Sequence, residues 1–415
     1  MIKTLLESVR FELGEIPPRR LGVAVSGGGD SIALLSVLTK YAQLQDIDLH
    51  VVTVDHGLRP EAEEEISFVA DLCAHWHLPH YVLHWDNWNG KGNLLAEARN
   101  ARYTLITKWA SSNMISQVVL GHTSDDQAET FIMRLVRGAG VDGLSAMASK
   151  TIYRDIIWVR PFLQITRESL RTYLRTEGLS WREDPSNENR DYQRIRVRDA
   201  LTIFADLGLS VDNLVQVTMK MADAKKALNW QVSIAARDMV TICGGAVVID
   251  HCQFQAQPYE IKRRLLAHSI QWIAGNVYSP RGPAVFRVMQ FMQAKQTSTL
   301  NGCQILTKDD LVYIFREYNA VRDISCATNQ IWDKRWMVFG SDDNPSLSVR
   351  ALGFSGIRQT KNWRDIGLPR AALLSTPSVW CEGDLLAAPI VLPDEKWTAF
   401  LQKGEENYFA ALLSH

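Results

Sequence analysis

The stretch Val23-Ala24-Val25-Ser26-Gly27-Gly28-Gly29-Asp30-Ser31 decides the expected fold of the N-terminal part of this chain. An apolar run over residues 21–25 predicts a strand, and apolar residues at helical spacing predict a helix over residues 32–44. The glycines between them permit positive φ angles and a close approach of the backbone to a ligand. The start of the helix directs free N–H groups and the positive end of its dipole towards an anion. The stretch therefore predicts a strand, an anion-binding turn and a helix.

The same alternation continues through the first half of the chain. Strands are expected over residues 49–54, 80–83 and 117–120, and helices over residues 61–77, 94–110 and 124–136. Strands that alternate with helices form a parallel sheet with both faces covered, which is the Rossmann-like α/β class. Such sheets bind ligands beyond the carboxyl ends of their strands. The chemistry is therefore expected in the turns after residues 25, 54 and 120.

The 415 residues are expected to form three domains. The α/β domain with the anion-binding turn covers residues 1–205, a helical domain covers residues 206–295, and a small mixed α+β domain covers residues 296–415. The helical patterns span residues 214–237 and 259–274, and the β-like runs span residues 311–315, 336–339 and 387–392.

The composition is that of an ordinary globular protein, with 46% hydrophobic and 22% charged residues. The net charge of −1 excludes a global basic field, so a nucleic-acid surface would have to be a local cluster. No apolar run is long enough to span a membrane, and no signal-peptide pattern is evident. The six cysteines form no Cys-x-x-Cys pair, which gives no sign of an iron–sulfur cluster or a structural zinc. We therefore expect a cytoplasmic protein with no membrane partner.

Ser26 and Ser31 flank the three glycines and can donate hydroxyl groups to phosphate oxygens. Asp30 would repel bare phosphate, so it is expected to support Mg²⁺ or to hold a hydrogen-bonding position. The stretch lacks the Gly-Lys-Ser/Thr ending of a Walker A loop and the spacing of a dinucleotide fingerprint. The alternative is a plain tight turn, but serines, glycines and an acid at this place together favour a phosphate-binding loop.

The second chemical motif runs from Gly121 to Thr130 and follows an apolar strand. Asp126 and Glu129 are three residues apart, so they share one face of the expected helix. Two carboxylates at the carboxyl end of a strand form a site for a cation, either a metal ion or an ammonium group. The alternative is an acidic first helical turn that faces solvent and suits the helix dipole.

Residues 160–198 contain nine arginines, no lysines and six acids. The end of this segment carries Arg182, Tyr192, Arg194, Arg196 and Arg198. Arginine forks bind phosphates and aromatic rings stack on unpaired bases, so these residues are candidates for an RNA contact. Alternating arginines would share one side of an extended strand, whereas a helix would spread them around its axis. A solvated charged helix is the competing interpretation.

The hexapeptide over residues 26–31 resembles the Ser-Gly-Gly-x-Asp-Ser loop of the N-type ATP pyrophosphatases. A longer series of motifs resembles the bacterial tRNA(Ile)-lysidine synthetases over roughly residues 20–200. Besides the two motifs above, the matching blocks are Val54 to Arg59, Glu97-Ala98-Arg99 with Arg102-Tyr103, Arg134 to Gly140 with Gly143-Leu144, Arg160 to Leu163, and Trp181 with Asp184 to Asn187. That family uses ATP to adenylate the wobble cytidine of an isoleucine tRNA with a CAU anticodon. L-lysine then replaces AMP at the 2-carbon.

The resemblance implies roles for individual residues. The ATP-binding residues would be Ser26, Gly27, Gly28, Gly29, Asp30, Ser31, Asp55 and His56, with Asp30 also supporting Mg²⁺. The lysine-binding residues would be Asp126 and Glu129, and the tRNA-binding residues would be Arg182, Tyr192, Arg194, Arg196 and Arg198. The catalytic residues would be Asp30, Asp126 and Arg137, with Arg134 as a further cation near the α-phosphate.

The chain departs from the family pattern at Ile195, where Asn is usual, which leaves a side-chain contact from this position open. The resemblance also implies tRNA binding by the helical domain over residues 206–295 and an acceptor-arm contact for the C-terminal domain over residues 296–415. A homodimer is left open. Three rival functions are less consistent with the sequence. A cytidine thiolase usually carries Cys-x-x-Cys elements, a small-molecule synthetase does not need the arginines, and a non-catalytic RNA-binding protein would be expected to lose the loop serines or Asp30.

Overall fold

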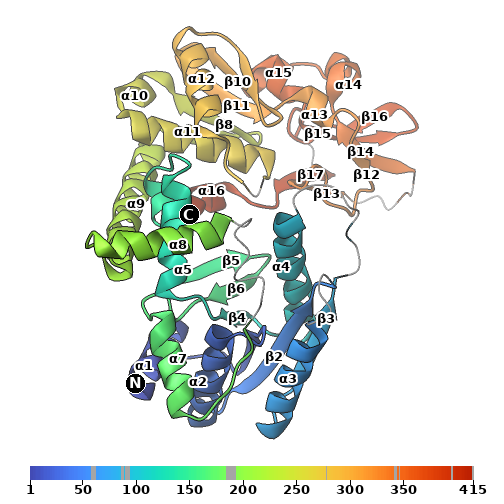
Figure 1. Cartoon of the computed structure of the whole chain (residues 1–415). Coiled ribbons are helices and arrows are strands. Elements are labelled where there is room, and N and C mark those ends of the chain that lie inside the picture. The colour runs from blue at the N-terminus through green and yellow to red at the C-terminus, as the bar shows by residue number, and fades with distance from the viewer. Residues whose placement is uncertain are drawn as a thin grey trace. The chain divides into compact units, whose positions relative to one another are not determined.

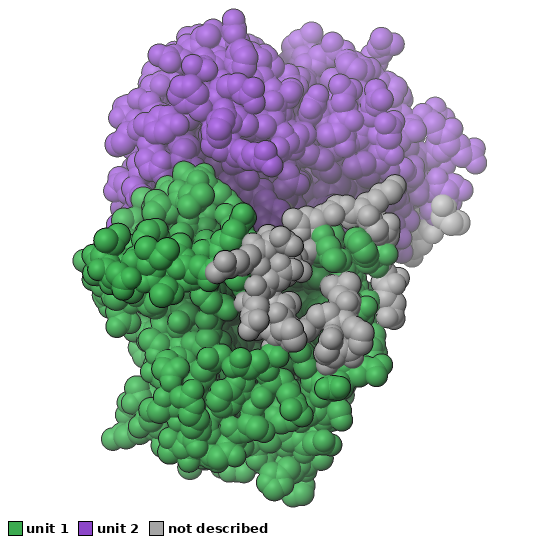
Figure 2. Space-filling model, in the orientation of Figure 1, with its two compact units in different colours: residues 1–225 green, residues 226–415 purple. Residues whose placement is uncertain are grey.

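The computed structural model describes residues 1–57, 62–85, 88, 94–183, 193–276, 278–340, 344, 346–393 and 396–413. The chain forms two compact units, residues 1–225 (unit 1) and residues 226–415 (unit 2), which Figure 2 shows in separate colours. Helix α9 (Val211–Met239) begins in unit 1 and ends in unit 2.

Unit 1 is built on a six-stranded sheet with the strand order β3-β2-β1-β4-β6-β5. In that order the strands span His80–His84, Asp48–Asp55, Arg20–Ala24, Gln117–Leu120, Ile156–Val159 and Lys150–Tyr153. The pairs from β3 through β6 are parallel, and β5 joins the edge as an antiparallel hairpin with β6. The expected α/β class with a parallel sheet is therefore confirmed.

Helices connect these strands and cover the sheet (Figure 1). The helices of unit 1 span Ile2–Leu13 (α1), Gly29–Gln45 (α2), Ala62–His75 (α3), Leu94–Ser112 (α4), Ser124–Leu135 (α5), Val141–Leu144 (α6), Arg167–Thr176 (α7) and Gln193–Asp206 (α8). Helix α8 packs against α5 rather than on the sheet. Successive residues of β2 face opposite sides of the sheet: Val51 packs into the core with α1, α2 and α7, and Val52 packs into the core with α4. Burial on both faces explains why these strands are continuous apolar runs.

Unit 2 combines helices with antiparallel sheets. Its strands form the sheets β7-β8-β11-β10-β9 and β12-β14-β15-β16 and the ribbon β13-β17. They span Val240–Cys243 (β7), Ala246–Asp250 (β8), Ser298–Leu300 (β9), Cys303–Lys308 (β10), Leu311–Arg316 (β11), Ser325–Cys326 (β12), Trp336–Gly340 (β13), Leu347–Ala351 (β14), Pro377–Cys381 (β15), Asp384–Ala387 (β16) and Trp397–Leu401 (β17). The helices are His251–Ala256 (α10), Tyr259–Ala274 (α11), Gly282–Gln293 (α12), Tyr318–Val321 (α13), Gly353–Gln359 (α14), Trp363–Ile366 (η2, a 3₁₀-helix), Arg370–Leu373 (α15) and Glu405–Leu413 (α16).

Two features of unit 2 differ from the sequence interpretation. The expected boundary between residues 295 and 296 falls inside the first sheet, because β11 pairs with β8 across it. The region interpreted as helical therefore contributes β7 and β8 to a mixed unit. The β-like run at residues 387–392 is mostly not a strand, because β16 ends at Ala387.

The structure also bears on two features of the composition, the apolar segments and the cysteines. Among the described residues, no single helix has the length and apolar character needed to cross a membrane. The bent pair α8 and α9, with 106° between its helices, meets these criteria only when both are taken together. All six cysteines are free thiols.

Candidate active site

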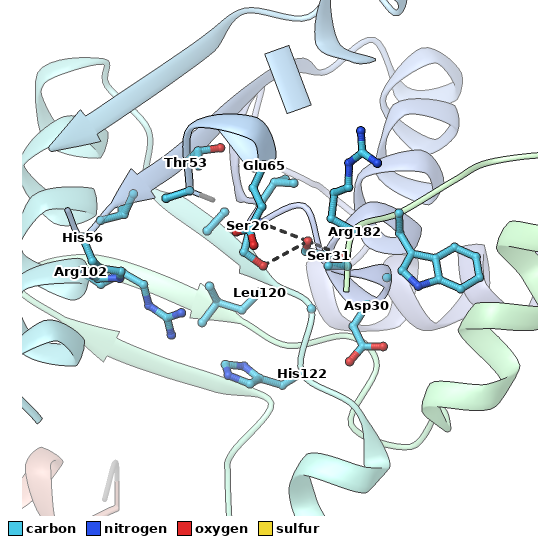
Figure 3. A pocket seen from close by; sticks show the side chains of 18 of the residues that line it. Ser26, Asp30, Ser31, Thr53, His56, Glu65, Arg102, Leu120, His122 and Arg182 are labelled. Carbon is cyan, nitrogen blue, oxygen red and sulfur yellow. Dashed lines mark hydrogen bonds between the residues drawn. The ribbon is translucent and has the colours of Figure 1, made fainter. Parts of the chain in front are cut away.

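A cavity of about 1020 Å³ opens in unit 1 beyond the carboxyl ends of β1, β2 and β4 (Figure 3). The end of each strand or the turn after it lines the cavity, with Ser26 and the run from Gly28 to Ser31 after β1, Asp55 and His56 at the end of β2, and Gly121 and His122 after β4. Gly27 of the predicted loop is not among the residues that line it. The structure thus brings together the three turns in which the sequence predicted the chemistry. The arginines that line the cavity are Arg99, Arg102, Arg167, Arg171, Arg182, Arg194 and Arg198.

The phosphate loop, defined as residues 26–31, is ordered by its own side chains. Gly27 has a φ of +83°, a conformation that favours glycine, and α2 begins two residues later. The Oγ of Ser31 donates to the carbonyl of Gly28 at 2.8 Å and accepts from the N–H of Ser26 at 3.2 Å. The hydroxyl of Ser31 therefore holds the loop in shape. Its partner Ser26, whose Oγ lies 3.5 Å away, is the serine better placed to donate to a phosphate.

Neighbouring segments press closely on this loop. A Cβ atom on Gly121 would lie 2.9 Å from the carbonyl oxygen of Asp30, so only glycine lets the end of β4 approach the start of α2 this closely. The N–H of Arg182 donates to the carbonyl of Gly27 at 3.0 Å. The side chain of Arg182 lies over the ring of Phe68, 5.1 Å from its centroid. Contacts with neighbouring segments therefore hold the phosphate loop in place.

Asp30 lies at the first turn of α2 and borders the cavity. Burial raises its pKa from 3.8 to about 6, although the nearby guanidinium of Arg167 opposes this shift. The Nε of Arg167 donates to Oδ2 of Asp30 at 3.1 Å. Of the described residues, no group of three or more His, Cys, Asp or Glu side chains is placed to hold a metal ion. A Mg²⁺ ion here would have Asp30 and the phosphate oxygens of a nucleotide as ligands, a combination that Mg²⁺ commonly accepts.

The acid pair, Asp126 and Glu129, lies on one face of α5, and both residues are buried, with 8% and 1% exposure. The solvent-facing alternative is therefore wrong. Asp126 also forms a capping box with Thr123 at the N-terminus of α5. Its Oδ2 accepts the N–H of Thr123 at 2.8 Å, and the Thr123 hydroxyl accepts the N–H of Asp126 at 3.4 Å. Asp126 lines the cavity, and Glu129 is enclosed by arginines next to it.

Three arginines neutralise the acid pair. Arg167 lies 3.3 Å from Asp126 and 3.6 Å from Glu129. Arg194 contacts both acids, through Nη2 to Oδ1 of Asp126 at 2.6 Å and through Nε to Oε2 of Glu129. Arg198 donates to Oε1 of Glu129 at 2.9 Å. The cations observed at this predicted cation site are therefore arginines of the chain itself.

The predicted RNA-contact residues separate into groups. The segment 193–206 is helical, so Arg194 and Arg198 lie one turn apart and face the acid pair, while Arg196 between them is exposed. Arg182 lines the cavity. Tyr192 lies outside the described residues.

Four predicted site residues remain: Asp55 and His56, which line the cavity, and Arg134 and Arg137, which lie outside it. Asp55 accepts the N–H of Gly57 at 2.8 Å and lies 3.2 Å from His84, and His56 packs against Trp85 with 5.9 Å between ring centroids. Arg134 and Arg137 are described in the structure, but neither lines the cavity. Arg137 donates to Gln193 at 2.8 Å. Arg134 donates to the carbonyls of Gly143 and Ala146 and thereby stabilises the turn around α6.

Sequence reasoning assigned no role to several nitrogen-bearing side chains of the cavity. Arg99 and Arg102 are three residues apart on α4 and both line the cavity, as does His122. Burial, followed by the nearby Arg102 and Arg160, lowers the pKa of His122 well below its usual value, so its imidazole is neutral. Its buried Nδ1 has no hydrogen-bond partner among the described residues. The signal in the sequence was the spacing of Arg99 and Arg102, which places both on one helical face.

Known proteins resemble this chain at several levels. Residues 2–203 match the PP-loop domain family. The tRNA(Ile)-lysidine synthase of Ruegeria pomeroyi is 45% identical over 99% of this chain and 98% of that protein. The tRNA(Ile)-lysidine synthase of Wolbachia pipientis wMel is 35% identical over 74% of this chain and 72% of that protein. Among solved structures, the U34-tRNA thiolase NcsA from Methanococcus maripaludis has 16% identity and a TM-score of 0.47 over 54% of this chain and 78% of that chain, which supports no functional conclusion.

Proposed function

Because the chain belongs to the tRNA(Ile)-lysidine synthase family, we propose that the unit 1 cavity uses ATP to join L-lysine to the 2-carbon of the wobble cytidine in tRNA(Ile) with a CAU anticodon. The observation that carries this proposal is that the phosphate loop and Asp126 border one cavity, and that Arg167 contacts both. The loop suits nucleotide phosphates, and the acid pair suits a cation. A ligase of this kind needs both in one place, because the activated cytidine must meet the amine there.

In the proposed reaction, the 2-carbonyl oxygen of the cytidine attacks the α-phosphorus of ATP, and the bond to pyrophosphate breaks. The ε-amino group of lysine then attacks the 2-carbon and loses a proton. The bond between the 2-carbon and its oxygen breaks, and AMP leaves with that oxygen. Adenylation is required because the cytosine oxygen is by itself a poor leaving group. The product carries lysine on the wobble base, which changes the codon read from AUG to AUA and the identity of the tRNA from methionine to isoleucine.

We assign the ATP phosphates to the N-terminus of α2, with the hydroxyl of Ser26 and the backbone of Gly28 and Gly29 as donors. Asp55 and His56, on the adjacent wall, are assigned to the nucleoside part of ATP. Mg²⁺ would be held by Asp30 and phosphate oxygens, and when bound it would neutralise charge on the phosphates.

Stabilisation of the charge on phosphorus is assigned to cations that already line the cavity. Arg99 and Arg102 meet this requirement. A catalytic role for Arg137 would require its side chain to leave Gln193 and turn into the cavity.

Lysine is assigned to the acid pair. The attacking ε-amino group must be neutral, whereas the α-amino group stays charged, so the acids would bind the α-ammonium group. Asp126 is the member of the pair that lines the cavity, and Glu129 has 1% exposure. We therefore propose that Asp126 contacts the amino acid and that Glu129 sets the charge of the site.

The tRNA is the substrate named by the family, and two parts of the chain support a contact with it. In unit 1, Arg182, Arg194 and Arg198 line the cavity that the wobble base must enter. In unit 2, the segment 353–373 exposes Phe354, Arg358, Lys361, Arg364 and Arg370. Arg370 lies over Phe354 and Arg364 over Trp363, at 5.7 and 4.6 Å from the ring centroids, which is a combination suited to RNA. We propose this segment as the acceptor-arm contact and place the reaction in the cytoplasm, where the three substrates meet.

The test is incorporation of labelled lysine into an isoleucine tRNA transcript with a CAU anticodon, in the presence of ATP and Mg²⁺. We expect stoichiometric labelling of this transcript and none of a methionine tRNA transcript. A folded protein that labels neither transcript would overturn the proposal. Pyrophosphate release that depends on the tRNA would separate an enzyme from a non-catalytic RNA-binding protein.

A further inference from the structure

Asp30, the acid pair and three arginines form one group of charges at the cavity. We call it the charge cluster, and its members are Asp30, Asp126, Glu129, Arg167, Arg194 and Arg198. Three carboxylates and three guanidinium groups give it a formal charge of zero. A lysine ammonium group that entered this cluster would be a fourth cation beside three carboxylates that are each already paired with an arginine.

Arg194 takes the position that an ammonium group would need. Its Nη2 lies 2.6 Å from Oδ1 of Asp126, and its Nε donates to Oε2 of Glu129. One side chain therefore satisfies both members of the acid pair. Arg198 adds a second bond to Glu129, at 2.9 Å.

The three arginines differ in their access to solvent. The side chain of Arg167 is 18% exposed, whereas those of Arg194 and Arg198 are 41% and 36% exposed. Arg167 is further fixed by its N–H, which donates to Asp125 at 2.7 Å. The two arginines of α8 can therefore reach an incoming ligand, while Arg167 stays with the acids.

We propose that Arg194 and Arg198 close the lysine site until a substrate phosphate draws them away, so that lysine binds tightly only after a phosphate-bearing substrate. The proposal rests on the assignment of lysine to the acid pair. Phosphate competes well with carboxylate for guanidinium groups, because both accept two parallel N–H donors. Arg194 and Arg198 line the cavity, where either an RNA phosphate or an ATP phosphate can meet them.

This exchange would make the binding of the substrates cooperative. Departure of Arg194 and Arg198 leaves Arg167 as the remaining arginine beside two acids, and the net negative charge then favours an ammonium group. By thermodynamic linkage, bound lysine would in turn strengthen the binding of the phosphate-bearing substrate by the same factor. Lysine would thus be excluded from an empty enzyme and admitted when the reaction can proceed.

The experiment measures the dissociation constant of labelled lysine by equilibrium dialysis, with three arms for the full-length protein: no addition, a non-hydrolysable ATP analogue, and the CAU transcript. We expect the wild type to bind lysine about tenfold more tightly in at least one phosphate-bearing arm, a typical size for coupling between sites. The arm that gives the increase identifies the source of the phosphate. Equal affinity in all three arms would overturn the proposal.

Arg194→Ala is the decisive variant. It is expected to bind lysine without any addition about as tightly as the wild type does with its phosphate-bearing partner, and to lose the coupling. Arg198→Ala, which keeps Arg194, should show a smaller increase. Unchanged lysine binding by Arg194→Ala would refute the closure. Weaker binding than in the wild type would also refute it and would place the arginine within the lysine site.

Two controls complete the design. Arg175→Ala removes another helical arginine, whose pair with Glu168 is exposed at 57% and 68%, and it should leave lysine binding as in the wild type. Thermal unfolding of each variant shows whether it is folded. Lysine incorporation by the same wild-type preparation separates the two hypotheses: no incorporation refutes the proposed function, whereas incorporation with uncoupled lysine binding refutes only the closure.

Discussion

The Nε atom of Arg167 donates a 3.1 Å hydrogen bond to Oδ2 of Asp30, and this bond joins the start of α7 to the phosphate loop. Nη2 of the same side chain lies 3.3 Å from Oδ1 of Asp126. One guanidinium group therefore links the wall assigned to ATP with the wall assigned to lysine. Because this side chain is 18% exposed, solvent and salt screen its contacts only in part.

Arg167→Gln removes the cation that Asp30, Asp126 and Glu129 share. Asp30 would lose its arginine, whereas the acid pair would keep Arg194 and Arg198. Removing one partner of a buried ion pair commonly lowers the free energy of unfolding by about 3–5 kcal/mol, and we expect a loss of this order in urea titrations. The control is Arg175→Ala, because exposed ion pairs such as the one between Arg175 and Glu168 contribute about 0–1 kcal/mol. Similar losses in the two variants would contradict a linking role for Arg167.

Asp30→Asn tests the raised pKa of Asp30. Burial moves this pKa from 3.8 to about 6, so the folded state is penalised when the carboxyl is ionised. The penalty is absent below the unfolded value and complete above about pH 6. We therefore expect the ligand-free Asn variant to be more stable than the wild type by about 1–3 kcal/mol at neutral to alkaline pH. Urea titrations should show a constant advantage above about pH 6 and an advantage that shrinks as the pH falls from about 6 towards 3.8. An advantage that grows as the pH falls would contradict the direction of the shift.

Glu129→Gln tests the assignment of the acid pair. The variant keeps the shape of the side chain but removes one of the two negative charges that would attract the lysine ammonium group. We expect the KM for lysine to rise by about tenfold or more, in line with the loss of a charged partner, while the affinity for an ATP analogue changes little. Steady-state incorporation kinetics and calorimetry measure the two quantities. Equal losses of both would move Glu129 from the lysine site to the nucleotide site.

Helices and strands of both units could be predicted from the sequence where buried residues give them an apolar pattern. The strand expected at residues 117–120 coincides with β4, and the helix expected at residues 259–274 of unit 2 coincides with α11. Strand β5 was missed because three of its four residues are exposed, so they leave no apolar pattern. Strand β6 was missed although its residues Ile156–Val159 are apolar and mostly buried. The secondary structure of the arginine segment was ambiguous, because alternating charges fit both a strand and a helix. In the structure the segment is helix α8, and the burial of Ile195 and Val197 helps to stabilise it.

The site was predictable only where one short segment supplies all the groups. The phosphate loop and the acid pair each lie within ten residues, so their patterns are visible in the sequence. Arg167 was missed because it lies 137 residues from Asp30 and 41 from Asp126 along the chain, and only the tertiary fold joins them. For the same reason, Arg194 was assigned to RNA from its local pattern, with no indication that it would meet the acids.

Arg358→Ala combined with Arg370→Ala tests the proposed RNA contact of unit 2. Both side chains are exposed, so their loss should leave the fold intact. If each contacts a phosphate, the slope of log affinity against log salt for the transcript should fall by about 1 per arginine. Filter binding at several salt concentrations measures this slope. Arg322→Ala, in an exposed pair with Asp323 of the same unit, is the control, and an unchanged slope in the double variant would exclude this segment from the interface.

Gly121→Ala tests the close contact between β4 and the phosphate loop. The added Cβ would lie 2.9 Å from the carbonyl oxygen of Asp30 and 3.1 Å from its carbonyl carbon, and backbone atoms cannot turn aside as a side chain can. The loop must therefore move, and we expect affinity for an ATP analogue to fall about tenfold or more, with about 1–3 kcal/mol of lost stability. Gly140→Ala is the matched control, because no heavy atom lies within 4 Å of its added Cβ. Calorimetric titration compares the two variants, and equal affinities would mean that the loop can shift without losing its hold on the phosphates.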